Sequence, residues 1–187
     1  MRRSLIVLAF LVFSSMTGCY FSATAKVVDA ETGEPIEGAV VLVEWTITRG
    51  LGLTYTESYK AIEAVTDKDG NAKISGEFNP FVNPPHVTAY KKGYVTWNDE
   101  YIFPDSKPRQ DFEYKNGMVM RLERFKPEYT HIAHENFFHS SIHSFMNTEA
   151  KTKIKEAFRW EELLSNEERT RNERMEESKK FAPKTTQ

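Results

Sequence analysis

The stretch AKVVDAETGEPIEGAVVLV, residues 25–43, holds two apolar segments joined by a segment rich in turn-forming residues. From Phe21 to Val27 the apolar residues occupy every second position, which is the period-two pattern of a strand with one buried face. The alternation resumes over residues 39–47, and the intervening segment contains Gly33, which is free to adopt a positive φ. We therefore expect two strands separated by a tight turn.

The second strand has two distinct faces. One face is expected to carry Ala39 and, further along, Trp45 at every second position. The other carries four residues that change from apolar to polar along the strand: Val40, Leu42, Glu44 and Thr46.

The rest of residues 20–125 continues in short apolar segments. The turns between them are marked by Gly, Pro, Asp and Asn, as at residues 67–71 and in the proline-rich loop 79–85. Further strands are therefore expected at 54–66, 72–75, 86–91, 94–97 and 118–122. Short strands separated by such turns are typical of an antiparallel β-sandwich.

Three motifs in this region resemble those of the carboxypeptidase regulatory-like family, whose domains are transthyretin-like. They are the opening run at residues 25–43, Thr66-Asp67-Lys68-Asp69-Gly70, and Ala89-Tyr90-Lys91-Lys92-Gly93-Tyr94. The resemblance implies a mainly β fold, a seven-stranded antiparallel prealbumin-like β-sandwich over residues 19–125. It also implies an accessory or binding module that is not an enzyme.

The first 18 residues have the three parts of a bacterial signal peptide. Arg2 and Arg3 supply the positive charge, residues 5–13 form the apolar part, and small residues follow over 14–18. The apolar part is too short to cross a hydrocarbon core, which needs about 20 residues. We expect residues 1–18 to be removed.

The residues around the end of this leader, Thr17-Gly18-Cys19, resemble the lipobox of bacterial lipoproteins. Cys19 is the single cysteine of the chain, so no intrachain disulfide is available to it. The resemblance implies a covalent lipid on Cys19 that attaches the chain to the membrane. Because Tyr20, and not aspartate, follows the cysteine, it further implies a position at the outer membrane facing the periplasm.

The composition excludes one large class of partner. The net charge is −2, and a slightly acidic chain lacks the basic face that nucleic-acid binding requires. The aromatic content of 13% is too high for a disordered chain, so a folded core is expected.

Beyond residue 125 the strand pattern ends. We expect a His-rich connecting segment over 126–147, a charged helix over 148–181 and a disordered tail over 182–187. Three residues at helical spacing, Ile154, Phe158 and Leu164, form an apolar stripe that either packs on the sheet or docks on a partner.

The His-rich segment allows two interpretations. In the first, the histidines line a half-exposed face while the neighbouring apolar residues pack on the sandwich: Phe137, Phe138, Ile142 and Phe145. In the second, four histidines bind zinc or another transition metal: His131, His134, His139 and His143. The metalloprotease pattern is absent, because His139 lies five and not four residues after His134. The first interpretation is favoured, and no cofactor other than the lipid is expected.

Two further groups of residues are candidate sites. Ser140 and Ser141 lie beside histidines but lack the sharp Gly-x-Ser-x-Gly turn of a serine hydrolase. Three aromatic residues, Tyr90, Tyr94 and Trp97, are the candidates for a sugar- or peptide-binding face, although such residues more often form the core or cover the edge of a sandwich.

The sequence therefore predicts a lipid-anchored protein of the cell envelope. Its sandwich is expected to be a non-catalytic structural or interaction module for an envelope protein or glycan. The alternative is a metal-binding envelope lipoprotein that uses the histidines from His131 to His143.

Overall fold

The structure, a computed structural model, describes residues 20–77, 81–149 and 152–181. In chain order its elements are β1 (Tyr20–Asp29), β2 (Val40–Arg49), β3 (Tyr55–Val65), β4 (Asn71–Glu77), β5 (His86–Tyr90), β6 (Trp97–Asn98), β7 (Tyr101–Ile102), β8 (Lys107–Pro108), β9 (Met118–Leu122), α2 (His131–Ser141), α3 (His143–Met146) and α4 (Lys153–Phe181). The leader 1–18, Cys19 and the tail 182–187 lie outside the described residues.

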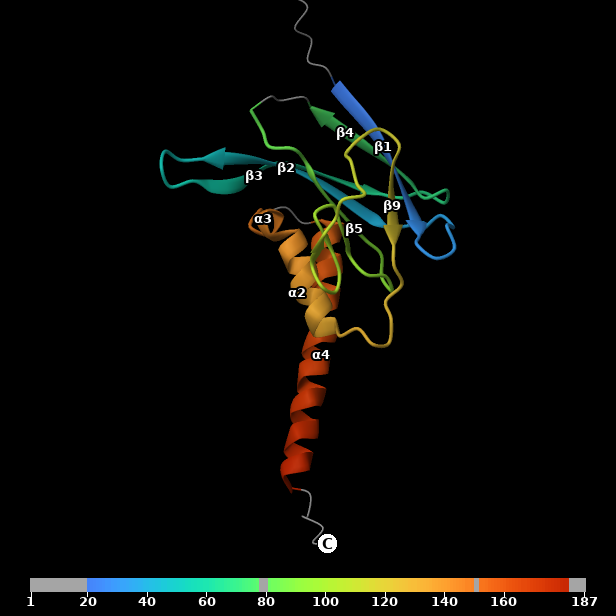
Figure 1. Cartoon of the computed structure of the whole chain (residues 1–187), viewed down its shortest axis with the longest axis vertical. Coiled ribbons are helices and arrows are strands. Elements are labelled where there is room, and N and C mark those ends of the chain that lie inside the picture. Colours follow the sequence, from blue (N-terminus) through green and yellow to red (C-terminus); the bar gives the residue numbers. More distant parts are fainter. Residues whose placement is uncertain (1–19, 78–80, 150–151, 182–187) are drawn as a thin grey trace, which may run out of the picture.

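The strands form two principal sheets (Figure 1). One has the order β4-β1-β9 and the other β3-β2-β5-β6, while β7 and β8 pair separately. The mainly β class, the antiparallel sheets and the C-terminal helix are confirmed. Two details differ from the prediction: β1 pairs with β9 in parallel, and the described residues hold nine strands, not seven.

The first core lies between the two sheets. It is lined by the alternating residues of β1, β2 and β9, including Val27, Val43 and Met120, all fully buried. Trp45 belongs to the same core and packs edge-on against Tyr114, with ring centroids 6.3 Å apart. The inward face expected for β2 is therefore confirmed.

The second core lies on the other face of β2, where three helices form a further layer. Val40 and Leu42 of β2 contact apolar side chains of α2, of α4 and of the segment between them, which include Phe138, Ile142, Phe145, Ile154 and Phe158. Phe137 is also buried, against Val95 and Phe103. The predicted packing of these residues on the sandwich is confirmed. Each fully buried Leu or Phe contributes roughly 1.5–3 kcal/mol of transfer free energy.

The helix boundaries differ from the sequence-based ones. The segment 126–147 is not a simple connection, because it contains α2 and α3. The long helix begins at Lys153, where the carboxylate of Glu63 on β3 accepts hydrogen bonds from the backbone N–H groups of Lys153 (3.1 Å) and Ile154 (2.8 Å). Such a carboxylate accepts hydrogen bonds from N–H groups of the first turn that have no partner within the helix. Its negative charge is also stabilised by the positive end of the helix dipole.

The last part of α4 extends away from the sandwich in Figure 1. Every residue from Thr170 to Lys180 is exposed, a length of about 16 Å. Within the described residues, no helix is both long and apolar enough to span a membrane.

Candidate functional site

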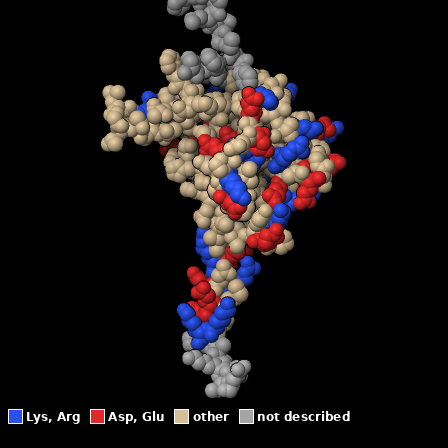
Figure 2. All heavy atoms as spheres, in the orientation of Figure 1, with Lys and Arg blue, Asp and Glu red and all other residues tan. Residues whose placement is uncertain are grey.

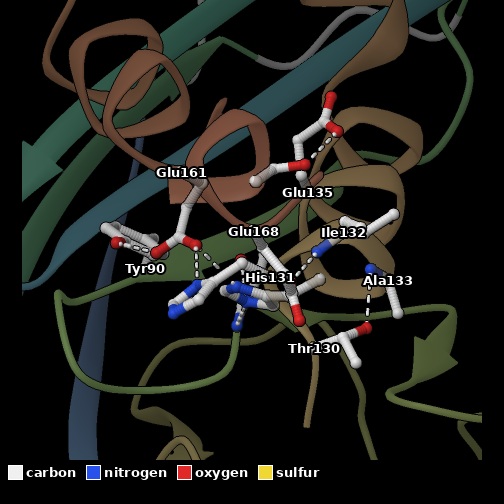
Figure 3. A network of polar contacts seen from close by, with 11 residues as sticks. Tyr90, Thr130, His131, Ile132, Ala133, Glu135, Glu161 and Glu168 are labelled. Atoms are coloured by element: carbon white, nitrogen blue, oxygen red, sulfur yellow. Dashed lines mark hydrogen bonds and ion pairs between the residues drawn. The ribbon is translucent and has the colours of Figure 1, made fainter. Parts of the chain in front are cut away.

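A buried carboxylate on α4 organises the His-rich segment. Glu161 is 3% exposed and points toward β5 and α2 (Figure 3). Its Oε1 accepts a hydrogen bond from the Tyr90 hydroxyl at 2.6 Å. Its Oε2 lies 3.1 Å from Nδ1 of His134 and 3.3 Å from Nδ1 of His131.

The partners of His134 determine which of its nitrogens carries the proton. Its Nε2 accepts a hydrogen bond from the backbone N–H of Thr96 at 2.8 Å. A backbone N–H can only donate, so this Nε2 has no hydrogen and the neutral imidazole carries its proton on Nδ1. That proton is donated to Glu161, and both ring nitrogens of His134 are thereby used.

The charges within this network are set by its hydrogen bonds. Burial alone would raise the pKa of Glu161, but hydrogen bonds from His134, Tyr90 and His131 outweigh burial and lower it. Burial and the adjacent Glu161 carboxylate raise the pKa of Tyr90, which therefore stays a hydrogen-bond donor. The network holds one negative charge below the surface.

Other polar contacts join α2 to α4 around this centre (Figure 3). At the start of α2, Glu168 accepts a hydrogen bond from the backbone N–H of Ile132 at 3.1 Å, and Thr130 caps Ala133 at 3.2 Å. Further along, Glu135 accepts a hydrogen bond from Arg169 at 2.8 Å. Glu168 and Thr130 thus supply acceptors for backbone N–H groups in the first turn of α2. The contacts of Glu168 and Glu135 also hold α2 and α4 together.

The predicted four-histidine metal site is not formed. His131 and His134 lie around Glu161, whereas His139 and His143 form a separate pair with ring centroids 5.8 Å apart. The four histidines therefore do not converge on one point, although His131, His134 and His139 all lie on α2. In residues 20–77, 81–149 and 152–181 no group of three or more His, Cys, Asp or Glu is placed to hold a metal ion.

The two serine hydroxyls are hydrogen-bonded within their own helix. The hydroxyls of Ser140 and Ser141 each donate to the backbone oxygen of Phe137 at 2.8 Å. Both therefore bond back to the preceding turn of their own helix.

The predicted aromatic binding face is also corrected. Tyr90 and Trp97 are buried, and Tyr90 stacks on Phe138 with centroids 4.8 Å apart. Tyr94 is half-buried and its hydroxyl donates to Asp29 at 3.1 Å. These residues stabilise the interior, because their apolar bodies face other side chains and not solvent.

A second polar cluster lies at the edge of the β2–β5 pair. Glu44 is buried, and Oε1 of Glu44 and Oδ1 of Asp99 have no hydrogen-bond partner among the described residues. Burial raises the pKa of Glu44 and raises that of Asp99 to about 6. His86, which is paired in register with Glu44, has its Nδ1 3.9 Å from Oδ2 of Asp99.

Sequence reasoning missed Glu161, Glu44 and Asp99. A signal was present for Glu161, because it follows Ile154 and Phe158 at seven and three residues and so continues their apolar stripe. A charged residue on a buried stripe indicates an internal partner. No comparable signal marks Asp99, whose neighbours His86 and Val87 lie on β5, thirteen and twelve residues earlier.

The comparisons with known proteins give no family. No family model and no curated protein matches the chain. One similar solved structure is chlorocatechol 1,2-dioxygenase from Pseudomonas putida, with 18% identity and a TM-score of 0.34 over 59% of this chain and 63% of that one. Another is a 9R-lipoxygenase from Cyanothece PCC8801, with 14% identity and a TM-score of 0.31 over 71% and 25%. The chain thus spans less than two thirds of either protein, and likenesses this weak transfer no chemistry to it.

Proposed function

We propose that the chain is a lipid-anchored protein of the bacterial envelope with a non-catalytic sandwich of the carboxypeptidase regulatory-like, prealbumin-like type. The observation that carries the proposal is the signal-like leader that ends at Cys19, and the position of the first strand is compatible with an anchor there. Tyr20, the residue next to Cys19, already pairs with Glu77 in the first sheet. A lipid on Cys19 would therefore hold the sandwich directly against the membrane, with no flexible linker between them.

The polar side chains around Glu161 form hydrogen bonds with one another, which supports a structural role for the histidine region. Glu161 accepts hydrogen bonds from three side chains, and both nitrogens of His134 are occupied. A catalytic acid or base needs a proton that it can exchange with a substrate. In this network the protons are instead donated in hydrogen bonds that hold α4 and α2 on the sheet.

The outer part of α4 is the surface that we assign to a partner. Leu163 and Met175 are exposed and lie along a shallow hollow that also includes Thr170, Arg171 and Arg174. Charged side chains of both signs with apolar ones between them suit a protein partner, since a helix of this kind is stabilised by docking. A glycan is disfavoured because two of the three candidate aromatic residues, Tyr90 and Trp97, are buried.

The lipid anchor is tested by labelling cells with radioactive palmitate. The native chain is expected to take up the label and to lose its leader. Cys19→Ala should give an unlabelled and unprocessed precursor, because it lacks the thiol that carries the first acyl chain. Equal processing of both chains would contradict the proposed anchor.

A further inference from the structure

The connection between β2 and β3 ends in an apolar tip. Its residues Gly50-Leu51-Gly52-Leu53 include two leucines that are 104% and 93% exposed. Tyr55, at the start of β3, is also exposed. The projection formed by this hairpin, at the left of Figure 2, shows little charge. Two fully exposed neighbouring leucines on a projecting turn indicate a surface that meets an apolar environment.

The tip is a built turn and not a loose loop. Gly50 and Gly52 have φ values of 107° and 90°, a region that other residues rarely adopt. A Cβ at Gly50 would overlap the backbone oxygen of Leu53, so only glycine allows the chain to close there. Below the turn, Arg49 of β2 forms an ion pair with Glu57 of β3.

The base of the hairpin is braced by the segment that follows β4. The side-chain amide of Asn83 donates to the hydroxyls of Thr46 (2.9 Å) and Thr48 (3.1 Å). Its backbone N–H donates to the Thr46 oxygen at 2.9 Å. These bonds fix the direction in which the tip points.

The same segment connects the tip with the start of the first strand. Tyr20 is in register with Glu77, the last residue of β4, and Asn83 lies only six residues further along the chain. Phe81, between them, is exposed. In Figure 1 β1 starts at the upper end of the sandwich, and the β2–β3 tip projects sideways from its upper half, so both are remote from the end of α4.

We propose that Leu51 and Leu53 insert into the phospholipid bilayer to which the chain is attached. This inference rests on the proposed lipid on Cys19. Residues 1–19, which carry the proposed lipid, join the sandwich at the start of β1, and the tip lies in the same half of the molecule, remote from the end of α4, which favours a bilayer over a protein as the occupant. An acyl anchor and an apolar tip then make two contacts with one membrane, and the second contact forms at a high effective concentration. Tyr55 would lie at the level of the headgroups, where tyrosine is enriched.

Two attachment points also define an orientation. With β1 and the tip against the membrane, α4 points into the aqueous space, where its outer surface meets a partner.

The test places an environment-sensitive fluorophore on the tip of the full, acylated chain. Cys19 is the single cysteine and is blocked when acylated, so Leu51→Cys provides the single reactive thiol. The protein is reconstituted in vesicles of phosphatidylethanolamine and phosphatidylglycerol that contain nitroxide-labelled lipid. We expect the probe at residue 51 to shift to the blue and to be quenched severalfold.

Ser178→Cys, on the exposed outer part of α4, is the matched control and should be neither shifted nor quenched. Vesicle-bound protein with no quenching at residue 51, or with equal quenching at both positions, would overturn the inference alone. Failure of the anchor is recognised separately: the reagent would then label two thiols per chain, and the intact mass would lack fatty acid.

Discussion

Glu161 carries a negative charge into the interface between α4 and the sheet. Glu161→Ala leaves the Tyr90 hydroxyl and Nδ1–H of His134 without their acceptor, and breaking such a buried charged partner costs about 3–5 kcal/mol. Urea unfolding should show this loss, whereas Glu162→Ala, at the next and exposed residue, should stay within about 0.5 kcal/mol. Equal effects of the two changes would contradict the assigned network.

The same carboxylate has a defined pH dependence. Its pKa is lowered in the folded chain, so its contribution is complete above its ordinary value of 4.5 and is lost as the pH falls through the folded pKa.

Asp99 behaves in the opposite way. The folded chain keeps its proton up to about pH 6, whereas an unfolded chain releases it near 3.8. The contribution of Asp99 to the free energy of unfolding should therefore decrease as the pH rises from about 4 to 6. Asp99→Asn removes the part of the pH dependence that belongs to Asp99 and should stabilise the protein by about 1–3 kcal/mol at pH 7.

The measurement is urea unfolding at a series of pH values. Asp69→Asn, in an exposed turn, is the control and should leave the profile unchanged. A native profile that rises between pH 4 and 6 and is unaffected by Asp99→Asn would be evidence against the buried carboxyl.

Gly70 and Gly33 allow steric overlap to be separated from backbone strain. Both have a positive φ, 75° and 74°, as the sequence predicted for Gly33. A Cβ at Gly70 would lie 2.5 Å from the backbone oxygen of Val27, whereas one at Gly33 meets nothing within 4 Å. Gly33→Ala should cost about 1 kcal/mol from strain alone, and Gly70→Ala clearly more, as measured by thermal unfolding. Equal shifts in melting temperature would show that the overlap is relieved.

Among the elements, α4 performs two tasks along its length. Its first half packs on β2 through Ile154 and Phe158, and its second half, from Thr170 onward, is exposed. A photo-crosslinking residue at Met175 should therefore capture a discrete protein in intact envelopes. The same residue at Val119, exposed on β9, should not. No product at Met175, or the same products at both positions, would count against a docking role for α4.

Most elements could be predicted from the sequence because their patterns are local. The alternation of β1 and β2 and the stripe of Ile154 and Phe158 are properties of single segments. The parallel pairing of β1 with β9 was not predictable, because it joins residues more than ninety positions apart, as at Ala25 and Met118.

The candidate site was less predictable for the same reason. The number of histidines is visible in the sequence, but their roles depend on distant partners. His134 is defined by Thr96, 38 residues earlier, and by Glu161, 27 residues later. The interruption at Ile142, which ends α2 and begins α3, has no glycine or proline to mark it.

At the scale of the whole molecule, the start of β1 and the free part of α4 lie at opposite ends. The first strand starts at the end of the sandwich opposite the free part of α4, and the apolar hairpin tip projects sideways from that same half (Figure 1). The two cores between these ends make the sandwich and helices one packed unit. A protein built in this way would hold a helix at a set distance from a membrane.

The most direct test of this account is the intact mass of the native protein extracted from bacterial envelopes with detergent. We predict a chain that begins at Cys19 and carries covalently bound fatty acids. A chain that begins at Met1 and carries no fatty acid would contradict the account, and only the description of the folded sandwich would remain.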